Sequence, residues 1–237
     1  MSPAASSPSG GGGGGDGGGD YSQPAEPETP AEAADTDTID DESVPLAEPG
    51  AIWDNPFIDV KEGDWFYADV EYTHLRGLIM GTSGNTFSPV TSTTRGMIVT
   101  ILYRHAGSPN VSALANPFSD AAGKYYTDAV KWGAANNIVV GVGGGRFEPE
   151  APVTRQDLAV IVANYAKSAG LQFPVTLQYQ TFTDESDIAE YAKNAVQTLY
   201  GGGIVSGKLN NIFDPLGEST RAEVASMLHR FLEAAGK

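Results

Sequence analysis

Apolar residues recur at helical spacing in three stretches of the chain, each of which begins with Thr-Arg. In the last stretch, residues 224, 225, 227 and 228 are apolar, a spacing that places them on one face of a helix. Thr220 with Glu223 three residues later predicts a capping box at its start. The pattern predicts three helices that start at equivalent threonines and end near equivalent glycines, which suit a left-handed stop: Thr94, Thr154 and Thr220; Gly107, Gly170 and Gly236.

A shorter helical pattern precedes each of these stretches, over residues 67–76, 126–136 and 188–200. Between the two helices stands a glycine, with Phe six residues later, Pro eight later and Arg fourteen later. Phe-x-Asp stands upstream of each unit, and its Asp is expected to cap the first helix of that unit. The register predicts three repeats, over residues 55–107, 116–170 and 180–237.

One unit of about 55 residues would bury too little surface to be stable alone. We therefore expect a mainly α domain of three helix-turn-helix repeats, with pseudo-threefold symmetry and the three second helices packed as a central bundle. Burial of each large apolar side chain there is worth about 1.5–3 kcal/mol. The first copy has Gly96 and Met97 after its Thr-Arg, which predicts a helix start weaker by about 0.5–1 kcal/mol.

Composition divides the chain near residue 50. Residues 1–50 contain eleven acidic residues, no Lys or Arg, and a glycine run, and such a segment buries too little apolar surface to fold. We expect a disordered linker over residues 1–50, a folded domain over 51–237, and a chain that is a piece of a longer protein.

The net charge of residues 51–237 is only mildly acidic, which argues against nucleic acid as a partner. No apolar run approaches the length of a membrane span.

The three arginines in the first helical turns (Arg95, Arg155 and Arg221) are unexpected, because the helix dipole favours acidic residues there. A guanidinium offers forked donors to a carboxylate, and helix N-terminal amides would add further donors to an anionic ligand. The alternative is that each arginine pairs with an aspartate of a neighbouring repeat and holds the packing together: Asp59, Asp120 or Asp184. The residues alone leave both interpretations open.

Two other groups of residues could contribute to such a ligand site. Gly81, Gly141 and Gly207 would allow close approach of backbone to a ligand. Trp65 and Tyr125 could stack on sugar faces, whereas the repeated phenylalanines and Trp132 are expected in the core.

The sequence contains no arrangement typical of a catalytic or metal site. Its three histidines, His74, His105 and His229, share no metal-ligand spacing, and there is no cysteine. No nucleophile motif or recurring catalytic pair is present. We expect no enzyme activity, no metal and no cofactor within these residues.

The combination of Phe-x-Asp, Gly-(x)5-Phe-x-Pro and Thr-Arg-x-Glu, repeated three times, resembles the S-layer homology domain of bacterial surface proteins. The resemblance covers residues 53–237 and implies a three-pronged spindle. It also implies grooves between repeats that bind an anionic, typically pyruvylated, secondary cell wall polysaccharide linked to peptidoglycan. This favours ligand contact for the arginines, an extracellular location at the cell wall or S-layer, and a monomeric anchor. Alternatives are a module for S-layer self-assembly without glycan, and the attachment domain of a secreted enzyme.

Overall fold

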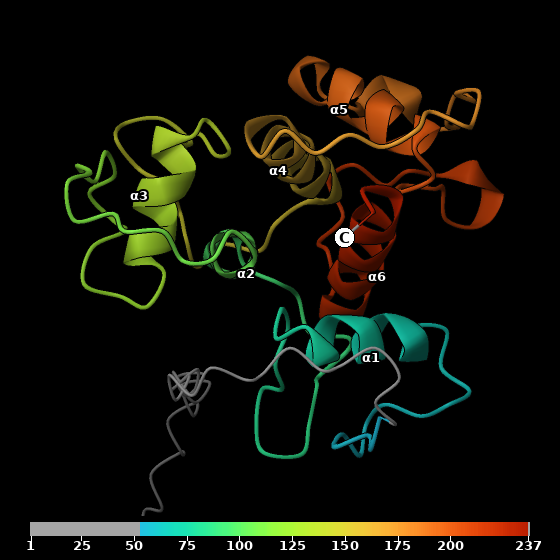
Figure 1. Cartoon of the computed structure of the whole chain (residues 1–237). Coiled ribbons are helices and arrows are strands. Elements are labelled where there is room, and N and C mark those ends of the chain that lie inside the picture. The colour runs from blue at the N-terminus through green and yellow to red at the C-terminus, as the bar shows by residue number, and fades with distance from the viewer. Residues whose placement is uncertain (1–52, 237) are drawn as a thin grey trace, which may run out of the picture. The chain divides into compact units, whose positions relative to one another are not determined.

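The computed structural model describes residues 53–236, which form six α-helices, two short 3-10 helices and no strand beyond isolated bridges. The mainly helical fold is thereby confirmed, and the predicted linker over residues 1–50 lies outside the described residues. Figure 1 shows the elements, which run α1 Tyr67–Leu75, α2 Arg95–His105, α3 Thr127–Ala135, α4 Arg155–Ser168, η1 Glu185–Asp187, α5 Glu190–Gly201, η2 Leu209–Asn211 and α6 Arg221–Ala234. Two α-helices fall within each predicted repeat; the repeat bounds themselves stay a prediction.

The second helix of each repeat starts and stops where the sequence predicts. The N-cap threonine hydroxyl accepts the amide hydrogen bond of the third helical residue in α2, α4 and α6. In α6 the box is complete, because the Glu223 carboxylate also accepts from the Thr220 amide at 2.9 Å. The glycines after the helices have φ angles of 82°, 65° and 68°, the left-handed conformation that ends a helix without strain: Gly107, Gly170 and Gly236.

The helices pair between repeats rather than within them. The first helix of each repeat packs on the second helix of the repeat before it, so that α3 lies on α2, α5 on α4 and, closing the cycle, α1 on α6 (Figure 1). That the second helices form a central bundle stays a prediction. They also meet through side chains such as Leu102, Tyr165 and Phe231, which surround a small apolar space. The spindle implied by the family resemblance stays a prediction.

A ring of backbone hydrogen bonds joins the residues just before the three second helices. The amide of Thr93 donates to the carbonyl of Ser219 at 2.8 Å, Ser219 to Val153 at 2.9 Å, and Val153 back to Thr93 at 2.9 Å. These are equivalent positions, each two residues before a first-turn arginine. Because buried backbone groups must be paired, each repeat depends on both neighbours to complete its hydrogen bonding.

Gly96, which looked like a defect in the first copy, has a packing reason. An added Cβ would lie 2.9 Å from a ring carbon of Tyr126 and 3.0 Å from the carbonyl oxygen of Pro149. The Tyr126 ring is fully buried, and its hydroxyl donates to Glu150 at 2.8 Å, so it has little room to move. The second repeat therefore requires a glycine in the first turn of α2.

We predict that Gly96→Ala destabilises the domain by about 1–2 kcal/mol, although alanine is the better helix former by about 1 kcal/mol. The reason is overpacking against Tyr126 and Pro149. Chemical denaturation followed by circular dichroism measures the change.

The matched control is Gly63→Ala, where an added Cβ meets nothing within 4 Å. It should change the free energy of unfolding by less than about 0.5 kcal/mol. A Gly96→Ala protein as stable as the parent would show that the contact does not constrain this helix.

Candidate functional site

Each first-turn arginine donates a hydrogen bond to the Phe-x-Pro turn of the next repeat. The Nε of Arg155 donates to the carbonyl oxygen of Phe213 at 2.7 Å, and a terminal nitrogen donates to the carbonyl of Ser206 at 3.4 Å. The other two arginines do the same: Arg95 to Phe147 and Val140, and Arg221 to Phe87 and Met80. All three are buried, with exposed fractions of 9% for Arg95, 7% for Arg155 and 8% for Arg221. An arginine stands in the first turn because it joins consecutive repeats, the third to the first included.

The arginines have further partners around the same turns. Each guanidinium lies over the ring of the phenylalanine whose carbonyl it contacts, at 4.7, 5.3 and 4.7 Å from the centroid for Arg95, Arg155 and Arg221. Arg155 pairs with Glu223 at 3.3 Å, and Arg95 with Asp157 at 3.7 Å. Burial lowers the pKa of Arg155, while the nearby carboxylates, Glu223 first, oppose that shift.

The aspartates of Phe-x-Asp hold the same turns from inside each repeat. The two carboxylate oxygens of Asp120 accept the amides of Phe147 and Glu148, both at 2.9 Å. Asp59 and Asp184 make the equivalent pairs. The expectation that these aspartates cap the first helices was wrong, since the residues that precede α1, α3 and α5 make no side-chain cap bond. Pairing of the arginines with these aspartates was one of the two interpretations left open; Arg95 and Arg155 form their ion pairs with the helix carboxylates of Asp157 and Glu223 instead.

The first-turn amides of the second helices are occupied by protein. In α4 the amides of Arg155 and Gln156 donate to the carbonyls of Gly217 and Pro215, at 2.9 and 3.1 Å, and the Asp157 amide donates to the Thr154 hydroxyl. The other two helices follow the same pattern. These amides are not free for an anion, which corrects the expectation that they add donors to a ligand site.

The repeated glycines are also explained in part by internal packing. An added Cβ at Gly81 would lie 2.8 Å from the Phe57 ring, and at Gly141 it would lie 2.6 Å from the Phe118 ring. Only glycine fits where the chain passes these aromatic rings. Gly207 differs, since it is close to Asn211 and also lines an open groove.

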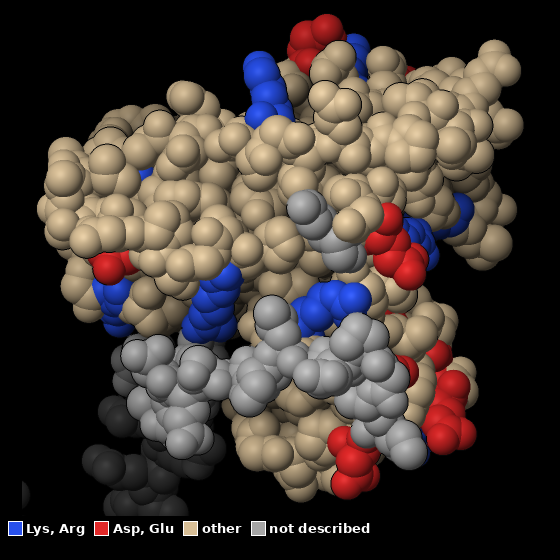
Figure 2. All heavy atoms as spheres, in the orientation of Figure 1, with Lys and Arg blue, Asp and Glu red and all other residues tan. Residues whose placement is uncertain are grey.

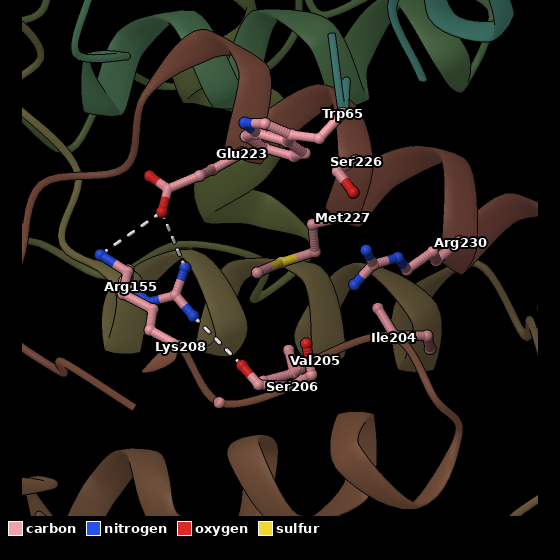
Figure 3. Close-up of a pocket in the computed structure, with 11 residues that line it drawn as sticks. Trp65, Arg155, Ile204, Val205, Ser206, Lys208, Glu223, Ser226, Met227 and Arg230 are labelled. Carbon is pink, nitrogen blue, oxygen red and sulfur yellow. Dashed lines mark hydrogen bonds and ion pairs between the residues drawn. The ribbon is translucent and has the colours of Figure 1, made fainter. Parts of the chain in front are cut away.

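That groove has a volume of about 320 Å³ and is formed where residues of all three repeats meet (Figure 3). We call it the Arg155 groove. Arg155 and Lys208 lie at one end, Arg230 lies at the other, and Trp65 lies above Met227. Glu223 accepts a hydrogen bond from Arg155 at 3.3 Å and forms an ion pair with Lys208 at 3.4 Å, while Lys208 donates to Asp214 at 2.8 Å. The groove also includes residues 204–207 and Ser226. It brings an exposed indole beside three cationic side chains.

The two aromatic candidates differ in exposure. Trp65 is 64% exposed, with its ring edge-on to Phe66, and it lines the Arg155 groove. Tyr125 is half-buried against Tyr126. Trp132 is buried, as expected. Sequence reasoning missed Tyr191, which stands sixteen residues before Gly207 as Trp65 does before Gly81.

Sequence reasoning also missed Lys208, Ser226 and Arg230. They belong to no repeated motif, because the equivalent positions in the second repeat are Val142, Val160 and Asn164. The one signal that could have found them is their position next to repeated residues. Lys208 directly follows Gly207, and Ser226 and Arg230 follow Arg221 in the same helix.

Residues 53–236 contain no group of three or more His, Asp or Glu side chains arranged to hold a metal ion. Within the same residues, every helix is too short or too polar to cross a bilayer. Figure 2 shows a face where acidic and basic side chains are scattered among uncharged ones.

Comparison with known proteins agrees with the repeat architecture. The family model described as S-layer homology domain matches residues 56–96, 117–159 and 181–225, together more than half of the chain. An endoglucanase of Bacillus sp. (strain KSM-635) is 28% identical over 177 residues, which are 75% of this chain and 19% of that protein. A cellulosome-anchoring protein of Acetivibrio thermocellus is 25% identical over 160 residues, 65% of this chain and 35% of that protein. An S-layer protein of Bacillus thuringiensis subsp. finitimus is 23% identical over 183 residues, 77% and 22% of the two.

The chain belongs to the S-layer homology domain family, with three tandem repeats as the sequence predicted. It is a cell-surface anchoring module with an extracellular, cell-wall-associated location. The chain spans well under half the length of each relative named above.

We predict that Arg155→Ala lowers the free energy of unfolding by about 2–4 kcal/mol, because it removes the buried hydrogen bond to the Phe213 carbonyl and one of the partners of Glu223. The matched control is Arg230→Ala, an exposed arginine in the same groove, which should cost less than about 0.5 kcal/mol. Urea unfolding of the parent and both variants measures these changes in the free energy of unfolding. Equal stabilities would show that the buried arginine does not join the repeats.

A second prediction concerns acid. Burial would raise the pKa of Asp120, but the two turn amides and Arg146 hold it below its usual value of 3.8. The folded state therefore favours the charged carboxylate, so its contribution is complete above the unfolded-state pKa and is lost as pH falls through the folded one. Asp120→Asn should show a shallower loss of stability below about pH 4 than the parent. Thermal melting between pH 2 and 6 measures this, with the exposed Asp128→Asn as control; parallel curves for all three proteins would contradict it.

Proposed function

We propose that this module anchors its protein non-covalently by binding an acidic secondary cell wall polysaccharide, pyruvylated and linked to peptidoglycan, in the grooves between repeats. The observation that supports this most is the Arg155 groove, an open site that combines three cationic side chains with an exposed indole. Protein sites for sugars need an apolar surface for the sugar ring and fixed polar groups around it. This groove has both.

The groove residues suggest a role for each part of the ligand. A sugar ring stacks on Trp65, whose exposed face is otherwise in water. A carboxylate on the sugar, such as a pyruvyl ketal, is attracted by Arg230 and Lys208. Arg155 is committed to the Phe213 and Ser206 carbonyls and so shapes the wall of the groove more than it reaches for ligand. We thus move the main ligand contact from the repeated arginines to the exposed cations beside them.

Weak binding in one groove is compatible with firm anchoring. A polysaccharide repeats its units, so several grooves or several domains can engage one polymer and gain by effective concentration. The relatives include an endoglucanase and a cellulosome-anchoring protein that are much longer than this chain. By analogy, we propose that the chain is the attachment part of a larger surface protein, monomeric by itself and without catalysis of its own.

We predict that Trp65→Ala weakens binding to purified cell walls by about three- to tenfold, because a ring contact worth roughly 0.5–1.5 kcal/mol is lost. Co-sedimentation of the protein with walls of the organism that encodes it measures the affinity.

Val90→Ala is the matched control, since Val90 is 82% exposed and does not line the groove. It should bind as the parent does. The proposal is wrong if the parent protein does not sediment with the walls, or if walls stripped of their secondary polysaccharide retain it equally well.

A further inference from the structure

The repeat register predicts two further grooves equivalent to the Arg155 groove, and the residues at the three sets of positions are not chemically equivalent. We infer that the Arg155 groove is the subsite for the acidic substituent of the glycan, and that the groove around Arg95 does not accept an acidic group. This inference rests on the proposed function and names the part of the domain that binds the acidic group of the glycan.

The repeat register identifies the matching positions. The groove around Arg95 is expected to be formed by residues one repeat earlier than those of the Arg155 groove. At the positions of Lys208, Glu223, Ser226 and Arg230 it has Val142, Asp157, Val160 and Asn164. At the position of Trp65 it has Tyr191, and the Tyr191 hydroxyl donates to Asp157 at 2.7 Å. That contact shows that the corresponding residues do meet at the Arg95 junction.

The two grooves therefore differ in formal charge. In the Arg155 groove, Arg155 pairs with Glu223 and Lys208 pairs with Asp214 at 2.8 Å, so the excess positive charge is that of Arg230. The corresponding Arg95 positions have one cation and one carboxylate. Arg95 and Asp157 lie 3.7 Å apart and largely neutralise each other. A bound carboxylate would meet net positive charge in the Arg155 groove and no net charge in the Arg95 groove.

The grooves differ also in which donors are still available. Among the described residues, Arg230 makes no hydrogen bond or ion pair with protein, and it is exposed. The Ser226 hydroxyl is buried beside the same groove and has no partner among the described residues. In the Arg95 groove the equivalent Asn164 amide already donates to the Ile138 carbonyl at 3.3 Å, and Val160 offers no donor.

The aromatic positions reinforce the contrast. The Tyr191 hydroxyl is held by Asp157, so the acceptor oxygens of that carboxylate are shared between Tyr191 and Arg95. Among the described residues, the Trp65 ring makes no equivalent hydrogen bond to Glu223, and one face of the ring lies open over the Arg155 groove (Figure 3). The third groove, around Arg221, has Arg104 at the position of Arg230 and Met97 at that of Glu223, so it is cationic and does not provide the contrast.

The experiment compares Arg230→Gln with Asn164→Gln by calorimetric titration. The probe is the soluble polysaccharide released enzymatically from walls of the organism that encodes the chain, used as isolated and after its carboxylates have been converted to neutral amides. We expect Arg230→Gln to bind the native polysaccharide about tenfold more weakly, as the loss of a charge-assisted hydrogen bond would give. On the amidated polysaccharide it should match the parent. Asn164→Gln should match the parent on both.

The outcomes separate this inference from the proposed function. If the parent protein binds the native polysaccharide but Arg230→Gln binds it equally well, the inference is wrong and the proposed function stands. The same holds if Asn164→Gln loses as much affinity as Arg230→Gln. If the parent binds neither form, the proposed function itself is wrong. Both variants change side chains that are at least partly exposed, and a melting curve for each verifies that it is folded.

Discussion

The architecture depends on one contact made three times, between a buried guanidinium and the backbone carbonyl of the next repeat's Phe-x-Pro turn. A buried cation is tolerated only when hydrogen bonds and nearby charge replace its water. Here the turn carbonyls accept from the arginine, while an aspartate holds the turn through its amides, as Asp184 does for the turn that Arg155 contacts. Aspartate, turn and arginine therefore form a chain of polar contacts that passes from repeat to repeat. Together with the backbone ring at Thr93, Val153 and Ser219, it makes the three repeats stable only as a set.

This arrangement separates the cations into two groups with different tasks. The repeated arginines are identical in all three copies because the same turn must be held at every junction. The exposed cations Lys208 and Arg230 do not join the repeats in this way, although Lys208 pairs with Asp214 of the turn in its own repeat, and both positions vary between copies. A domain built in this way can keep its structure constant while each groove acquires its own preference for a ligand. That is a physical reason for a threefold repeat to have grooves of unequal chemistry.

Local chemistry made much of the fold predictable from the sequence. The threonine caps and glycine stops depend on neighbours within a few residues, and the register of landmarks revealed the repeats. The partners of the arginines were not predictable, because Arg221 contacts Phe87, which lies 134 residues away. Nothing in the local sequence says which repeat provides that turn. The same limit applies to helix pairing and to the role of Gly96, which depends on Tyr126 of the next repeat. The groove cations escaped notice because a repeat search favours what is shared, and Arg230 is matched by Asn164 in the second copy.

The central claim is that buried arginines build the junctions while the exposed residues of the Arg155 groove contact the glycan. A crystal structure of the domain with an oligosaccharide fragment of the wall polymer tests this most directly. The account predicts a sugar ring over Trp65, its acidic group within hydrogen-bond distance of Arg230 or Lys208, and Arg155 still bonded to the Phe213 carbonyl. A sugar bound elsewhere, or an Arg155 side chain that leaves Phe213 to hold the acid, would contradict it.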